Sequence, residues 1–133
     1  MSQNITYQIN DRPEPDSICN LREAVGYDRN EKEYPTALDR YDVTVSAYNK
    51  NGSLVGWCAA VSDGVRHGFL VDLIVHPESQ RRGIGRSLVQ HAIEFLLRSG
   101  ISVIHADFND ENAAFYEKCG FRIGVGGICE KRK

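Results

Sequence analysis

The hexapeptide Gln80-Arg81-Arg82-Gly83-Ile84-Gly85 combines two glycines with two arginines directly before a helical pattern. The first turn of a helix leaves backbone N–H groups without partners, and the helix dipole adds partial positive charge at the same end. Glycines let the backbone close around a phosphate group, and arginine side chains can bind one. The sequence therefore predicts that this segment binds a phosphorylated ligand.

The glycine spacing does not fit the two common nucleotide-binding patterns. A Walker loop has Lys followed by Ser or Thr after its second glycine, whereas Arg86 and Ser87 follow Gly85. A dinucleotide fingerprint needs a third glycine where Leu88 stands. Asp107 lies near the spacing of the acidic residue in that fingerprint, but the missing glycine and the late position of the segment argue against it. The phosphate therefore belongs to another class of ligand.

Hydrophobic patterning places the hexapeptide between a strand and a helix. Residues 69–75 are nearly all apolar, as in a strand covered on both faces, and residues 84–98 have a one-faced helical pattern. Residues 28–41 are polar and predict a loop or a short broken helix. Further strands are expected at 5–9, 43–48, 54–61, 101–108, 121–125 and 128–131, and further helices near 16–27 and 109–119. This order predicts an α+β fold, in which a mixed central sheet of about six to seven strands has helices on both faces.

A second motif lies on the last expected helix. Asn109 is followed by Tyr116 seven residues later, and Gly120-Phe121 ends the helix. Val75-His76-Pro77 stands just before the glycine-containing hexapeptide. Together, these residues resemble the acyl-CoA-binding pattern of the GNAT N-acetyltransferases, and the order of elements is similar to that of the GNAT fold. The resemblance implies transfer of an acetyl group from acetyl-CoA to a primary amine of a small molecule or peptide.

The resemblance also implies a single GNAT domain over residues 1–133 and assigns its cofactor side. Backbone N–H groups from Arg81 to Ser87 would hold the CoA pyrophosphate. Strand residues 73–75 would splay from the neighbouring strand and pair with pantetheine, and Asn109 would hydrogen-bond the same arm. Acetyl-CoA would be the acyl donor, coenzyme A the product, and no metal is expected. The implied cofactor-binding set is Leu73, Ile74, Val75, Gln80, Arg81, Arg82, Gly83, Ile84, Gly85, Arg86, Ser87, Asn109 and Tyr116.

The same resemblance assigns Tyr116 as the acid that protonates the CoA thiolate, although its spacing alone would suggest a core aromatic residue. A main-chain N–H near Ile74 or Val75 would polarise the acetyl carbonyl. Asp72 is a charge inside an apolar strand, where an unpaired carboxylate is costly. It is therefore either the base that accepts the amine proton or a structural carboxylate. His76 is the alternative base, and its position beside a proline predicts that it faces solvent.

Composition and charge are those of an ordinary globular protein. The 133 residues are 41% hydrophobic and 26% charged, which predicts one domain with its own core and excludes a disordered chain. A net charge of −2 gives no support for a nucleic-acid partner, and no apolar run of about 18 residues predicts a membrane span. Residues 1–42 carry five basic and nine acidic side chains, whereas residues 43–133 carry eleven and nine. This distribution suits an anionic cofactor in the later part and a cationic substrate in the earlier part.

The four cysteines are widely spaced and form no Cys-x-x-Cys pair, so they are expected to be free thiols. Residues 1–4 lack the basic and apolar regions of a signal peptide, and a reducing cytoplasm is the expected location.

Two other functions remain open at the level of sequence: a GNAT-fold module that binds acyl-CoA or regulates a partner without catalysis, and an enzyme for a longer acyl-CoA. The acceptor amine is not specified, although residues 19–41 and the strands near Asp72 would shape its site. Dimers are common in the family, so a homodimer is a further option that the sequence leaves open.

Overall fold

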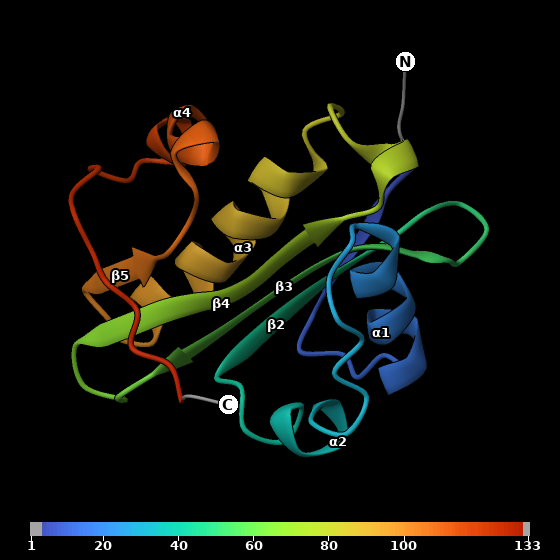
Figure 1. Cartoon of the computed structure of the whole chain (residues 1–133), viewed down its shortest axis with the longest axis horizontal. Helices are drawn as coiled ribbons and strands as arrows, with labels where there is room; N and C mark the ends of the chain where they lie inside the picture. Colours follow the sequence, from blue (N-terminus) through green and yellow to red (C-terminus); the bar gives the residue numbers. More distant parts are fainter. Residues whose placement is uncertain (1–3, 132–133) are drawn as a thin grey trace.

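In the computed structural model, which describes residues 4–131, five strands form one mixed sheet in the order β1-β2-β3-β4-β5 (Figure 1). Neighbouring strands from β1 to β4 are antiparallel, and β5 runs parallel to β4. The ends of the expected domain, residues 1–3 and 132–133, lie outside the described residues. The strands are β1 (Thr6–Ile9), β2 (Val43–Tyr48), β3 (Leu54–Ser62), β4 (His67–Val75) and β5 (Val103–Ala106).

Helices lie on both faces of the sheet, which confirms the predicted α+β class. Helix α3 (Ile84–Arg98) packs on β2, β3 and β4, while α1 (Pro15–Ala24) packs on β3 and β4 from the opposite face (Figure 1). The remaining elements are α2 (Tyr34–Ala37), α4 (Ala113–Lys118) and two 3-10 turns, η1 (Pro77–Ser79) and η2 (Asp110–Asn112). The short α2 is the broken helix expected within the polar segment.

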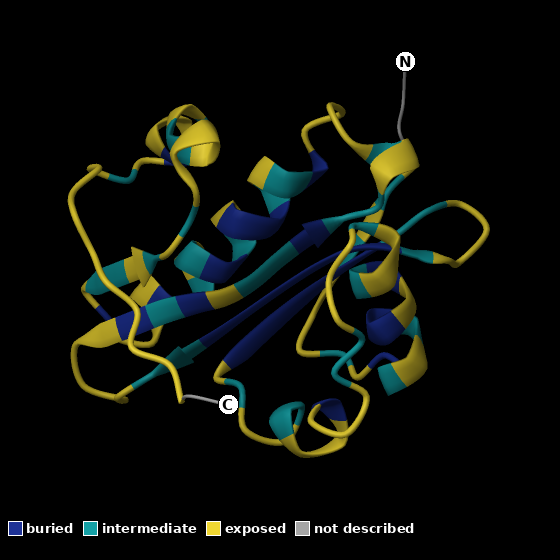
Figure 2. Ribbon diagram, in the orientation of Figure 1, coloured by how far each residue is buried: buried dark blue, intermediate teal, exposed yellow. Residues whose placement is uncertain are grey.

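Each face of the sheet has its own apolar core, and burial is concentrated in β2, β3 and the inner sides of α1 and α3 (Figure 2). The core under α3 includes Val45, Leu88 and Leu96, and Tyr116 of α4 extends it. The core under α1 centres on Trp57, which is fully buried. Because burial of apolar surface is the main stabilising term in folding, these two cores fix the position of β4 between them.

Strand β4 contains a bulge at Val71. Ala59 of β3 pairs with Asp72, but the next residue, Ala60, pairs with Leu70, so Val71 has no partner in β3. Side chains alternate along a regular strand, and one inserted residue reverses the alternation beyond it. Leu70 therefore faces the core under α3, whereas Asp72 and Ile74 face α1 and α2.

The prediction of six to seven strands was too high because the two expected C-terminal strands are not formed. Residues 121–131 have neither helical nor strand structure, and Val125 and Ile128 of this segment are exposed. The segment contains Gly124, Gly126 and Gly127, and glycine carries a large entropic cost when it is held in a strand. Its apolar residues therefore do not offset the cost of ordering it beside β5.

The structure also gives the state of the cysteines and of the helices among the residues that it describes. All four cysteines are free, as predicted; Cys19, Cys58 and Cys119 are buried and Cys129 is exposed. Within residues 4–131, no helix combines the length and the apolar character needed to cross a bilayer.

Candidate active site

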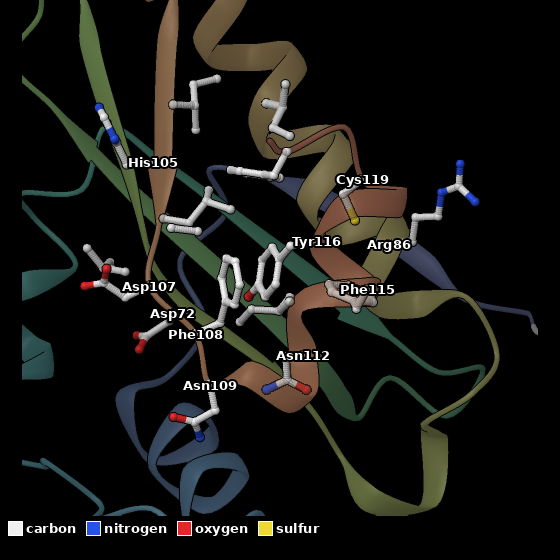
Figure 3. Close-up of a pocket in the computed structure, with 18 of the residues that line it drawn as sticks. Asp72, Arg86, His105, Asp107, Phe108, Asn109, Asn112, Phe115, Tyr116 and Cys119 are labelled. Atoms are coloured by element: carbon white, nitrogen blue, oxygen red, sulfur yellow. The ribbon is translucent and has the colours of Figure 1, made fainter. Parts of the chain in front are cut away.

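A large cleft of about 1680 Å³ lies where β4 and β5 separate, and α4 and the start of α3 form its other walls (Figure 3). Asp72 of β4 and Tyr116 of α4 both border it, although they lie in different elements (Figure 3). The predicted cofactor-binding residues that line this large cleft are Leu73, Val75, Gln80, Arg81, Gly83, Ile84, Gly85, Arg86, Asn109 and Tyr116. Ile74, Arg82 and Ser87 do not line it.

The two strands separate because β5 is short. Pairing between them ends at Leu70 and Ala106, and β4 then continues to Val75 without a partner on that side. The N–H of His76 donates to O of Val55 on β3 over 2.8 Å. Since backbone groups alternate in direction along a strand, the N–H and C=O groups of Val75 and Leu73 face the open edge.

The same alternation removes Ile74 from the expected contacts. Its backbone groups are directed toward β3, and its side chain is buried beside Trp57 in the core under α1. From the sequence, all three residues 73–75 are expected to contact the cofactor, because an unbroken apolar run does not show which backbone groups face which neighbouring strand.

The N-terminus of α3 lies where the sequence predicts an anion site. Gly83 is its N-cap residue and has a left-handed backbone with φ of +81°, and no side chain caps the helix. Within residues 4–131, the N–H groups of Ile84, Gly85 and Arg86 make no backbone hydrogen bond. The N–H of Ser87 already donates to O of Gly83 over 3.1 Å, so the predicted cradle is one residue shorter than expected.

The glycines of this turn have different structural roles. A Cβ atom on Gly83 would have no neighbour within 4 Å, so the space above the helix end is open to a ligand. A Cβ atom on Gly85 would lie 3.4 Å from the ring of Phe115, so this glycine lets α3 approach α4.

The polar side chains of the turn also differ in role. The amide Nε2 of Gln80 donates to O of Val75 over 2.9 Å, which ties the turn to the end of β4. Arg81 and Arg86 line the large cleft, and Arg81 has a left-handed backbone with φ of +65°. Arg82 is exposed and lies away from the cleft. The positive charge available to a bound anion therefore comes from Arg81 and Arg86.

Tyr116 lies in an aromatic cluster at the base of the large cleft. Its ring stacks on Phe108 with centroids 4.3 Å apart and meets Phe115 and Phe121 edge to face. Its hydroxyl has no hydrogen-bond partner within residues 4–131. Burial raises the pKa of Tyr116 to about 12, so the phenol stays protonated near neutral pH and can donate a hydrogen bond.

Asp72 is held in a network on the other face of β4. Its Oδ2 accepts a hydrogen bond of 2.8 Å from the hydroxyl of Tyr34, and Oδ1 lies 3.4 Å from Nη1 of Arg22. Burial raises the pKa of the Asp72 carboxyl, and Tyr34, Arg22 and the nearby Trp57 oppose this rise. The indole Nε1 of Trp57 is buried without a hydrogen-bond partner of normal geometry among the described residues. Asp72 is thus hydrogen-bonded and paired as a structural carboxylate would be, and it also borders the large cleft.

A small cavity of about 170 Å³ borders the large cleft. The residues that line it are Arg22, Asn30, Glu33, Tyr34, Ala37, Tyr41, Val71 and Asp72. Of the residues that the structure describes, only Val71 and Asp72 line both spaces. The bulge in β4 therefore forms the wall between the large cleft and the small cavity.

Other candidates fall outside this arrangement or were not foreseen. His76 lines neither space, and its Nδ1 accepts a hydrogen bond from N of Glu78 at the start of η1. Asn109 lines the large cleft with a side chain that makes no capping bond, so it is not simply a helix cap. The contacts of Arg22 and Tyr34 with Asp72 were not foreseen, because these residues lie 50 and 38 residues from Asp72 in sequence and no local pattern connects them.

The chain matches the acetyltransferase (GNAT) family over residues 6–121, so it belongs to this family. It is 30% identical over 100 residues to the uncharacterized N-acetyltransferase ycf52 of Pyropia yezoensis. That match covers 73% of this chain and 58% of the relative, so the chain spans little more than half of the relative's length.

Solved structures give the same result for the fold. A GNAT family acetyltransferase from Streptococcus pneumoniae superposes with a TM-score of 0.79 at 28% identity, covering 97% of this chain and 99% of that one. A Staphylococcus aureus protein of unknown function superposes with a TM-score of 0.85 at 21% identity, covering 96% and 99%, and supports the fold alone. The family and fold predicted from the motifs are confirmed.

Proposed function

We propose that this protein is an N-acetyltransferase that transfers the acetyl group of acetyl-CoA to a primary amine by direct attack. The proposal rests on one observation: Val71 and Asp72 line both the large cleft and the small cavity. A donor in the first space and an amine in the second would come together at one point of β4. Direct transfer requires this proximity because it brings both reactants into a single complex.

The donor side has features that fit an anionic, amide-containing cofactor. The free N–H groups at the start of α3, together with Arg81 and Arg86, would hold the pyrophosphate. The open-edge groups of Leu73 offer hydrogen bonds to the amides of the pantetheine arm, with Asn109 on the opposite wall. Ile74 and Ser87 have no part in this arrangement.

Bound acetyl-CoA would supply an activated thioester whose carbonyl carbon accepts the amine. The chain would supply a main-chain N–H from the open edge of β4 for the carbonyl oxygen, with Val75 the better placed of the two residues expected for this role. Tyr116 would donate its hydroxyl proton toward the departing sulfur, for which its raised pKa keeps it protonated. Asp72 would take the proton of the amine, directly or through water.

The proposal also covers the domain and the cellular compartment in which the reaction would take place. Residues 1–133 would act as one catalytic domain. The four free cysteines support a reducing compartment such as the cytoplasm.

Release of free thiol from acetyl-CoA, measured with a panel of primary amines, tests the proposal. We expect amine-dependent release of coenzyme A and formation of an equal amount of acetylated amine. Calorimetry with coenzyme A, run in parallel, separates binding from catalysis. Tight coenzyme A binding with no thiol release for any amine would contradict the enzyme and favour a non-catalytic binding module, while turnover only with longer acyl-CoA would change the donor.

A further inference from the structure

The small cavity combines two carboxylates with apolar walls. Asp72 lies at its inner end beside Val71, and Glu33 belongs to the exposed segment that precedes α2. Tyr34 and Tyr41 contribute aromatic rings to its walls, and Ala37 adds an apolar side chain. Such walls suit a short methylene chain, whereas the two carboxylates suit positive charges.

Glu33 is a carboxylate of the cavity wall that has no ion-pair partner among the described residues. The carboxylates around it are occupied: Glu31 and Glu23 pair with Arg29, and Asp39 pairs with Arg12. Within residues 4–131, no cation pairs with Glu33. Its negative charge would therefore be available to a ligand.

Among the described residues that line the cavity, Arg22 is the one cation, and it is already paired. Nε of Arg22 donates to O of Asp28 over 2.6 Å, and Nη1 lies 3.4 Å from both Asp72 and the hydroxyl of Tyr34. The guanidinium also lies over the ring of Tyr27, 5.3 Å from its centroid. An acceptor that carries a carboxylate or phosphate would thus meet Glu33 without a free cation to balance it, which is unfavourable.

We propose that the acceptor is a small aliphatic diamine or longer polyamine, with its reacting amino group at Asp72 and its second ammonium group paired with Glu33. The proposal rests on the proposed function and assigns the substrate class of the same site. A cavity of about 170 Å³ holds a short diamine, and the exposed position of Glu33 lets a longer polyamine continue into solvent.

The reaction balances without a further co-reactant. The reacting ammonium group loses one proton to Asp72, and its nitrogen lone pair forms the bond to the acetyl carbon. The carbon–sulfur bond breaks, its electron pair stays on sulfur, and the thiolate takes a proton from Tyr116. The nitrogen loses its second proton to solvent as the amide forms, and solvent then restores the proton of Tyr116 and removes the proton from Asp72. The products are the monoacetylated diamine, coenzyme A and one proton.

Steady-state kinetics with 1,4-diaminobutane and 1-aminobutane test the assignment, because these amines differ only in the second ammonium group. We expect the wild-type protein to prefer the diamine by about fivefold in kcat/KM, through KM, as is typical of a partly exposed ion pair. In Glu33→Gln the preference for the diamine should be largely lost. Glu31→Gln is the matched control, since Glu31 lies on the same segment, pairs with Arg29 and does not line the cavity.

Equal use of the two amines by the wild-type protein, or a diamine preference that survives in Glu33→Gln, would overturn the assignment. Calorimetric binding of both amines in the presence of coenzyme A gives a readout that does not depend on turnover. Diamine binding that depends on Glu33 without any acetylation would support the assignment and count against the proposed function. Acetylation of 1-aminobutane and 1,4-diaminobutane at equal rates would support the function and count against the assignment.

Discussion

The large cleft and the small cavity are built from different parts of the polypeptide. The cleft offers mainly backbone groups, namely the open edge of β4 and the first turn of α3, which lie within 20 residues of one another. The cavity offers side chains, and its network joins Asp72 to Arg22 and Tyr34 across 50 and 38 residues of sequence. Under the proposed function, the backbone groups would recognise what all acyl-CoA molecules share, whereas the side chains of the cavity would recognise one class of acceptor.

The largest effect should come from Gly83→Asp, which breaks the cleft and leaves the cavity unchanged. The substitution places a negative charge and a strained left-handed side chain at the anion site, and we expect about a 1000-fold loss of coenzyme A affinity. Gly83→Asn is the matched control, because asparagine has the same shape, tolerates this conformation better and carries no charge. Calorimetry with coenzyme A measures both, and equal losses in the two variants would show that strain rather than charge is responsible.

Asp72→Asn removes the charge from the wall that the large cleft and the small cavity share. We expect kcat/KM for the amine to fall about 100-fold, as for loss of a general base, with coenzyme A affinity nearly unchanged. Because burial raises the pKa of Asp72, wild-type activity should fall with decreasing pH at values above the ordinary carboxyl range. Tyr34→Phe removes a hydrogen bond that lowers this pKa, so it should move that decline to still higher pH. A pH–rate profile that is the same in all three proteins would leave Asp72 with a structural role only.

Tyr116→Phe should have a smaller effect, confined to turnover. The ring contacts with Phe108, Phe115 and Phe121 remain, so folding and coenzyme A binding should be preserved. We expect kcat to fall about 30-fold, the size of one lost hydrogen bond to a charged sulfur. The measurement is kcat at saturating amine, and an unchanged value would remove Tyr116 from the chemistry.

The sequence predicted those parts of the molecule that depend on local pattern. The glycine turn before α3, the position of Tyr116 and the α+β class follow from short-range spacing, and the structure contains them. The bulge at Val71 was not predictable, because an apolar run covered on both faces has no alternation that could reveal a reversal. The network around Asp72 was missed for a related reason, since only folding brings α1 and α2 to β4.

The bulge makes Val71 an inserted residue that the pairing between β3 and β4 does not require. Val71 is exposed and has no partner in β3, so we expect many substitutions there to be tolerated. Deletion of the same residue would make Leu70 and Asp72 consecutive partners of Ala60 and Ala59, so a regular strand would still turn Asp72 toward α1. Asp72 would therefore keep Arg22 and Tyr34 as partners, while the wall between the large cleft and the small cavity would lose Val71. A codon lost at this position would therefore change that wall more than the fold of β4.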